Sequence, residues 1–334
     1  MTNLSTAARV NARRLIEGPS DKLMAVTPLK HKWAWEVLEV MEQNTWFPHD
    51  VRLGNDKLFY ATQLQDQKKE AFDGALAFLS NLDGLQLHNI TDNIVPHVTS
   101  PEVRMCLTRQ AWEEAVHVKS YSTGIEEFAV DPMSVYMRFE RDGVLAAKNE
   151  HVMRQSAILG ESYSARNFTM ALVANVALEG IYFYSGFLIF YILAKNGEMV
   201  QWSDMIRYIQ RDEETHLRLF ENMLATQKEE RPELFNARFW DDALVLLDES
   251  RKLEATWGKH LIGPGILGYT PQMVDDYMKC LTNERARKIG LPELYPGVVN
   301  PVPWVKKFSE VNDTKQNFFE AKPTAYAVGA LDWD

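Results

Sequence analysis

Apolar residues recur every three or four positions over most of the chain, and strict alternation of apolar and polar residues is scarce. That spacing predicts amphipathic helices rather than strands. Prolines, glycines and short polar turns separate the periodic stretches, and Ser100 and Ser203 stand where helices are expected to begin. The expected helices cover residues 30–43, 57–82, 101–128, 133–146, 166–195, 203–226, 231–258 and 271–288. The prediction is an all-α bundle whose helices are long enough to cross the whole domain.

Two segments of different character flank the periodic region. Residues 1–28 are largely polar and are expected to form an N-terminal extension. Residues 29–303 should form the helical bundle. In residues 304–334 the periodicity weakens, and small residues, a proline and scattered aromatics take its place. That composition is typical of a flexible or extended C-terminal tail.

The charge and the apolar content of the chain exclude some classes of function. The net charge of −10 argues against binding to nucleic acid or anionic membranes through bulk charge. The most apolar stretch, 181–194, is too short to span a bilayer comfortably and is expected to be a buried helix. No signal-peptide pattern is evident, so a cytoplasmic location is expected. Cys106 and Cys280 form no CxxC pair, and any thiol-dependent chemistry would therefore use the thiols of a partner.

One short motif occurs twice and indicates a metal site. Glu114 and His117 are three residues apart, and Glu213 and His216 repeat that spacing on a later predicted helix. Positions i and i+3 of a helix lie on one face, so each pair can bind one ion. A single copy arises easily by chance on a charged helix, but two copies on apolar helices favour a shared site. Carboxylate-bridged dimetal bundles combine two such helices with one carboxylate from each of two others.

Two further carboxylates are candidates to complete the set. Glu179 lies in the apolar stretch LVANVALEGIYFYSGFLIF, where it needs a cation unless its side chain reaches water, because a buried unpaired carboxylate is costly. Asp83 is the best candidate on the helix before Glu114, with Asp92 as its competitor and a loop or cap role open for either. Four carboxylates would balance two divalent cations. Oxygen and nitrogen donors without thiolates suit iron or manganese rather than structural zinc.

Longer segments resemble one protein family over nearly the whole chain. The chain is similar to the small, radical-generating β subunit of class I ribonucleotide reductase in the segments RQAWEEAVHVKSY, LEGIYFYSGF, IQRDEETH, GLPELYPGVVNPVPW and NFFE…Y…GALDW. The likeness is strongest toward the branch that includes the chlamydial-type manganese/iron subunits. It implies a ferritin-like bundle and a carboxylate-bridged dinuclear centre of iron and/or manganese, as Fe/Fe, Mn/Fe or Mn/Mn. It also implies a large catalytic subunit as partner, contacted through the C-terminal tail, and a homodimer.

The resemblance assigns roles to particular residues. The six metal ligands would be Asp83, Glu114, His117, Glu179, Glu213 and His216. Trp46 matches the tryptophan of an electron-transfer path, and Asp212 matches the aspartate that links it to a ligand histidine. Tyr326 matches the tyrosine that relays the radical across the subunit interface, and Glu320 is a weaker match to a tail glutamate. Packing is the alternative role for Trp46, and a tail without function is the alternative for Tyr326.

Tyr121 lies one helical turn after His117, where many members of that family carry a radical-bearing tyrosine. A spacing of four residues stacks the two side chains on one helical face, so the phenol should lie beside the metals. The resemblance places Phe183, Phe187 and Ile209 around this radical site. The chlamydial-type relatives have a phenylalanine here, and their metals hold the oxidising equivalent. A tyrosyl radical and an oxidised metal pair therefore both stay open, as does a core tyrosine bonded to a ligand carboxylate.

The expected function is therefore the radical-generating small subunit of a ribonucleoside-diphosphate reductase, which supplies an oxidant to a large subunit for deoxynucleotide synthesis. One rival keeps the metal chemistry: a dimetal ligand-binding oxidase or acyl desaturase of the same fold, with no use for Tyr326. Ferritin-like iron storage is a third candidate, and the length of the chain and its irregular tail disfavour it.

Overall fold

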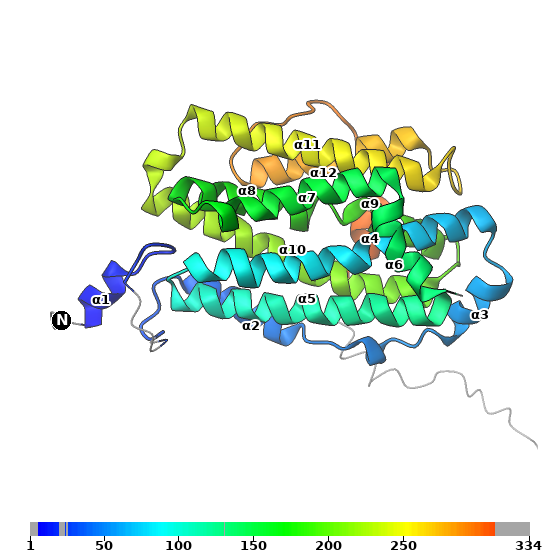
Figure 1. Ribbon diagram of the computed structural model, residues 1–334, viewed down its shortest axis with the longest axis horizontal. Coiled ribbons are helices and arrows are strands. Elements are labelled where there is room, and N and C mark those ends of the chain that lie inside the picture. The colour runs from blue at the N-terminus through cyan, green and yellow to red at the C-terminus, as the bar shows by residue number, and fades with distance from the viewer. Residues whose placement is uncertain (1–5, 20–23, 25, 130, 311–334) are drawn as a thin grey trace, which may run out of the picture.

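The computed structural model describes residues 6–19, 24, 26–129 and 131–310, and it is built from helices (Figure 1). The longer helices are α4 (Asp66–His88), α5 (Pro101–Phe128), α7 (Gly143–Glu161), α8 (Ala165–Gly180), α10 (Val200–Glu230), α11 (Ala237–Ile262) and α12 (Pro271–Lys288). The shorter helices are α1 (Thr6–Ala12), α2 (Lys32–Gln43), α3 (Gly54–Thr62), α6 (Pro132–Arg141), α9 (Tyr184–Lys195) and α13 (Trp304–Ser309). Single helical turns are η1 (Pro48–Asp50), η2 (Asn89–Ile94), η3 (Val95–His97) and η4 (Pro232–Leu234). The all-α prediction is confirmed, since only isolated bridges and no named strand occur among the described residues.

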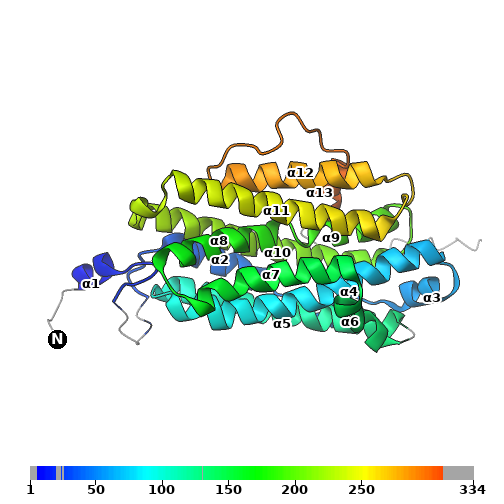
Figure 2. The ribbon, with the colours of Figure 1, turned by 45° about the horizontal axis from the view of Figure 1, so that its top comes forward.

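The long helices run side by side along the longest axis of the molecule (Figures 1 and 2). Helix α5 lies along one side of the bundle, α11 and α12 lie along the opposite side, and α8 and α10 lie between them. Helix α4 packs along α5, and α10 packs along α8. Each of these four helices turns an apolar face inward, and one continuous core joins them.

Three predicted helices, now α2, α5 and α12, match the structure closely. The predicted helix 57–82 is two helices, α3 and α4, and the second continues through Asp83 to His88. The sequence Asp-Gly at this point indicated a helix end, but a glycine in mid-helix costs only about 1 kcal/mol and tertiary packing outweighs it. The predicted helix 133–146 is also two helices, and α7 continues to Glu161.

Helix starts were predicted correctly at one serine and wrongly at the other. The hydroxyl of Ser100 accepts a hydrogen bond from the backbone N–H of Val103, 3.4 Å away, and caps α5. Ser203, in contrast, lies buried within the first turn of α10, which begins at Val200. The residue before that helix, Met199, has a left-handed backbone with φ of 52°, which no periodic pattern reveals.

The predicted helix 166–195 is broken between α8 and α9. Distant side chains bind the backbone groups that the break releases. Arg285 donates from Nε to the carbonyl oxygen of Gly180 over 3.0 Å, and Glu254 accepts the backbone N–H of Ser185 over 2.9 Å. This stretch is apolar and long enough to cross a membrane, but its most apolar window is completely buried inside the bundle, so it is a core element.

Both ends of the described chain contact the bundle. The backbone N–H of Leu15 donates to Oε2 of Glu230, at the end of α10, over 2.8 Å. At the other end, the first residues of the predicted tail form α13, and the ring of Phe308 lies 5.6 Å from that of Tyr191. Residues 311–334 lie outside the described part of the chain, so the tail stays a prediction.

Candidate metal centre

The structure brings all six predicted ligand residues together inside the bundle. One group of potential ligand atoms comes from Asp83, Glu114, His117 and Glu213, and the other comes from Glu114, Glu179, Glu213 and His216. Within each group the atoms lie within 4.8 Å of one another. Helices α4 and α8 supply one carboxylate each, and α5 and α10 supply one Glu-x-x-His pair each. Two residues belong to both groups, which is the arrangement of two neighbouring ions bridged by carboxylates.

The competitor for the α4 ligand lies elsewhere. Asp92 is in the π-helical turn η2 with 67% of its side chain exposed, and its Oδ2 is 3.5 Å from Nδ1 of His88. Asp83 is fully buried. The continuation of α4 through Asp83 therefore places Asp83, and not Asp92, in the cluster.

The hydrogen bonds missing around these side chains test whether cations fit. All six residues are completely buried. Among the described residues, no hydrogen bond reaches either oxygen of Asp83, Oε2 of Glu114 or Oε2 of Glu179. Within the same part of the chain, Nδ1 of His117 and Oε1 of Glu213 have only each other as a hydrogen-bonding partner, 3.0 Å apart. Buried polar atoms in proteins are normally satisfied, and buried charges are paired or bind metal. These oxygen and nitrogen atoms therefore fit a pair of cations such as iron or manganese.

Burial and the crowding of like charges also shift the pKa values of the carboxylates in the cluster. Burial raises the pKa of Asp83 well above its usual value, and the charges of Glu213 and Glu114 raise it further. Burial and the same two carboxylates also raise the pKa of Glu179. Glu213 differs: burial alone would raise its pKa, but the imidazoles of His117 and His216 outweigh burial and lower it. Crowded carboxylates thus retain protons unless positive charge is supplied.

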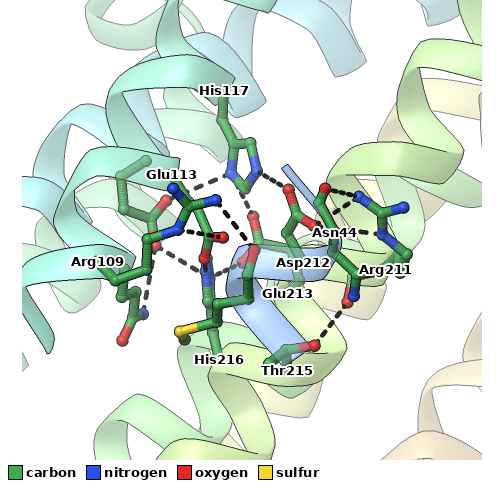
Figure 3. A network of polar contacts seen from close by, with 12 residues as sticks. Asn44, Arg109, Glu113, His117, Arg211, Asp212, Glu213, Thr215 and His216 are labelled. Atoms are coloured by element: carbon green, nitrogen blue, oxygen red, sulfur yellow. Dashed lines mark hydrogen bonds and ion pairs between the residues drawn. The ribbon is translucent and has the colours of Figure 1, made fainter. Parts of the chain in front are cut away.

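Each histidine of the cluster contacts a further carboxylate on its outer side (Figure 3). Nε2 of His117 lies 3.3 Å from Oδ2 of Asp212, and Nε2 of His216 lies 2.9 Å from Oε2 of Glu113. Such contacts fix the orientation of a ligating imidazole, and here they turn Nδ1 of each ring toward the carboxylates of the cluster. Glu113 was not among the predicted site residues, although it directly precedes Glu114.

The carboxylate of Asp212 connects the cluster to an aromatic residue outside it. Its Oδ2 accepts a hydrogen bond from Nε1 of Trp46 over 2.6 Å. The ring of Trp46, itself 3% exposed, stacks on that of Tyr208 with a centroid distance of 5.2 Å. The predicted neighbours Trp46, Asp212 and His117 are therefore in direct succession. Tyr208 was not predicted, although its spacing of four residues before Asp212 places it on the same helical face.

Tyr121 is completely buried on α5, and its hydroxyl makes no hydrogen bond with any described residue. The structure therefore does not support the alternative of a phenol bonded to a ligand carboxylate. Burial raises its pKa strongly, and the neighbouring charge of Asp83 raises it further. The residues expected to line the radical site are also buried in this core, and they are Phe183, Phe187 and Ile209. Tyr326 and Glu320 lie outside the described residues.

Comparison with known proteins decides the family. The sequence model of the family described as "Ribonucleotide reductase, small chain" matches residues 23–301. The chain belongs to this family. A ribonucleoside-diphosphate reductase subunit beta of Treponema pallidum is 35% identical over 330 residues, which cover 95% of this chain and 92% of that protein. The corresponding subunit of Chlamydia pneumoniae is 31% identical over 318 residues, which cover 92% and 91% of the two chains.

A solved structure agrees with the sequence comparisons. The ribonucleotide reductase R2 subunit from Clostridium botulinum superimposes with a TM-score of 0.86 at 32% identity, covering 89% of this chain and 94% of the other. The ferritin-like fold of this small chain is therefore shown. Family membership and the two overlapping groups of ligand atoms together support a dinuclear metal site.

Proposed function

We propose that this small chain supplies an oxidising equivalent from a dinuclear metal site to the large subunit of a ribonucleoside-diphosphate reductase. The observation that carries the proposal is the direct succession of His117, Asp212 and Trp46, which leads out of the buried cluster. A mere metal store would need no aromatic residue hydrogen-bonded to the carboxylate that contacts a ligand histidine. The proposed ligands are Asp83, Glu114, His117, Glu179, Glu213 and His216.

Iron or manganese ions bound at these residues would supply a one-electron oxidising equivalent. The protein has to bind the ions, keep water from the oxidised group and provide one path for electron transfer to the partner. All six ligand side chains are completely buried, which meets the second need. We propose that this path runs through Trp46. Asp212 would accept the indole N–H both before and after the ring loses an electron, so that the ring keeps its position.

Tyr121 is the proposed holder of the oxidising equivalent. A phenol that bears a radical has lost an electron and a proton, so it must be close to an oxidant and shielded from solutes. Its complete burial and its place one turn from His117 support this role. Electron paramagnetic resonance of freshly activated protein tests it. A tyrosyl signal that Tyr121→Phe abolishes is expected, whereas a coupled metal signal that survives Tyr121→Phe would place the equivalent on the metals.

The proposed partner is a large subunit that holds the substrate site and the reactive cysteines. The chain offers one buried cysteine, Cys106, and one partly exposed cysteine, Cys280, and they are not bonded to each other, which supports this division of labour. We propose that residues 311–334 dock on the large subunit and that Tyr326 relays the radical. Tyr326→Phe should abolish turnover with the large subunit while the metal content stays at the wild-type level. Unchanged turnover would contradict the relay role of Tyr326, whereas no turnover with a large subunit even for the wild type would favour the oxidase or desaturase.

The protein should also show no nucleotide reduction without its large subunit. We assign reduction to the two-subunit complex, so turnover by the purified small chain alone would contradict the proposal. We further propose a cytoplasmic homodimer. Sedimentation should then give about twice the chain mass of 38.4 kDa, and a monomer would refute this part.

A further inference from the structure

The two carboxylate oxygens of Glu179 have different surroundings. Oε1 accepts hydrogen bonds from the side-chain amides of Gln110, over 2.7 Å, and of Gln86. Oε2 makes no hydrogen bond with any described residue. All three side chains are completely buried. One oxygen is thus held by the protein and the other is free.

The orientation of the Gln86 amide is fixed by its neighbours. Its Oε1 accepts from Nδ2 of Asn89 over 3.0 Å, and its Nε2 donates to Oδ1 of Asn175 over 3.0 Å. Asn89 also donates to Asn175 over 3.0 Å, and it begins the π-helical turn η2. A flipped Gln86 amide would place its oxygen against two acceptors, Glu179 and Asn175. The NH₂ group therefore has to face Glu179.

Gln110 is arranged for donation alone. Its Nε2 donates to Glu179 and also lies 3.3 Å from Oε1 of Glu114, whereas its own Oε1 has no hydrogen-bond partner among the described residues. A buried acceptor without a partner costs about 1–3 kcal/mol. An apolar side chain of similar volume would avoid that cost. The amide is therefore placed for its donor, which acts on the carboxylates of the cluster.

Asp83, the counterpart of Glu179 in the other group, has no such restraint, because neither of its oxygens is hydrogen-bonded. Asp83 can bind its ion through both oxygens. We propose that Gln86 and Gln110 are positioning residues that restrict Glu179 to one metal-binding oxygen, Oε2. The ion beside His216 then receives one protein donor fewer than the ion beside His117, and a water or an oxidant can take the position that remains. This inference rests on the proposed dinuclear site and deepens it.

Manganese titration of the purified chain tests the inference. Methionine has a length similar to glutamine and no amide, so Gln86→Met, Gln110→Met and the double variant release Oε1 in steps. Gln227→Met is the matched control, because Gln227 is also completely buried and its amide has no partner among the described residues. Bound Mn²⁺ is followed by electron paramagnetic resonance, and its water ligands are counted from hyperfine coupling to ¹⁷O-labelled water.

The expected result is a selective change at one ion. The single variants should bind the first Mn²⁺ as the wild type does and the second about 10- to 100-fold more weakly. The double variant should in addition lose one water ligand, because the released oxygen of Glu179 takes that position. Equal weakening of both ions, or an unchanged water count in the double variant, would overturn the inference. If the double variant does not fold, unchanged affinity for the second ion in both single variants overturns it.

This outcome is separable from the proposed function. A wild-type chain that binds two Mn²⁺ ions but never activates a large subunit would refute the reductase role and leave the restraint on Glu179 standing. A chain that reduces nucleotides normally, but whose Gln86 and Gln110 variants match the wild type in metal binding, would refute the restraint alone.

Discussion

The two outer carboxylates of the cluster permit a matched test of the proposed exit path. Asp212 and Glu113 each contact Nε2 of a ligand histidine, at 3.3 Å and 2.9 Å respectively. Beyond that shared contact they differ. Asp212 accepts the indole N–H of Trp46 over 2.6 Å, whereas Glu113 accepts from Nε of Arg109 over 3.0 Å. Asp212→Asn and Glu113→Gln should therefore have similar effects on metal binding and different effects on radical transfer.

The magnitude follows from the bonds that each variant weakens. Either change turns a charge-assisted hydrogen bond of about 1.5–3 kcal/mol into a neutral one of about 0.5–1.5 kcal/mol, so the adjacent ion should bind about tenfold more weakly. The NH₂ group of the new amide faces another donor at either position. Arg211 donates from Nη2 to Oδ1 of Asp212 over 3.2 Å, and Arg109 contacts the corresponding oxygen of Glu113. Only Asp212→Asn, however, disturbs a hydrogen bond to the indole of Trp46.

The assay separates the two effects by saturating the metal site first. Each variant is loaded until its manganese or iron content reaches two ions per chain, and turnover is then measured with the large subunit. Glu113→Gln should regain activity near the wild-type value. Asp212→Asn should stay slower by about 10- to 150-fold, the equivalent of 1.5–3 kcal/mol lost from the path through Trp46. Recovery of both variants, or failure of both at full metal content, would refute the assignment of Asp212 to the path.

Three further predictions concern metal, pH and packing. Glu179→Ala should lose at least one ion per chain while the helical circular dichroism is retained, and two bound ions by metal analysis would contradict its role as a ligand. Because the pKa values of Asp83 and Glu179 are raised, the stability they contribute is present at low pH and lost as pH rises through those raised values. The melting temperature of metal-free protein should therefore fall over that window, and metal binding should tighten and release protons; calorimetry that detects no proton release would contradict this. Gly124→Ala would place a methyl group 2.4 Å from the ring of Trp202, so chemical denaturation should show a loss of about 1–3 kcal/mol, and an unchanged midpoint would refute it.

Some features of this protein follow from short-range sequence alone. The two Glu-x-x-His pairs can be recognised from the sequence, because residues three apart share a helical face whatever surrounds them. The place of Glu179 in the cluster was predictable because a carboxylate in a long apolar helix needs a positive partner. The all-α class follows from the same periodicity, since amphipathic spacing is a property of each helix separately.

Other features depend on residues that only the folded chain brings together. The only local signal for the break between α8 and α9 is Gly180, because the groups that bind its free backbone atoms, Arg285 and Glu254, lie far along the chain. The choice of Asp83 over Asp92 required α4 to continue through a glycine, which packing against α5 decides and propensity does not.

The detailed hydrogen bonding of the metal site also depends on the folded chain. The sequence by itself indicated which side chains can bind metal, with Asp92 left as an alternative to Asp83, because donor chemistry and helical spacing are local properties. Only the tertiary structure showed which oxygen of Glu179 is free, since that depends on amides donated by α4 and α5 to a carboxylate on α8. Hydrogen bonds act over about 3 Å between groups distant in sequence, so their partners are defined only once the helices have packed.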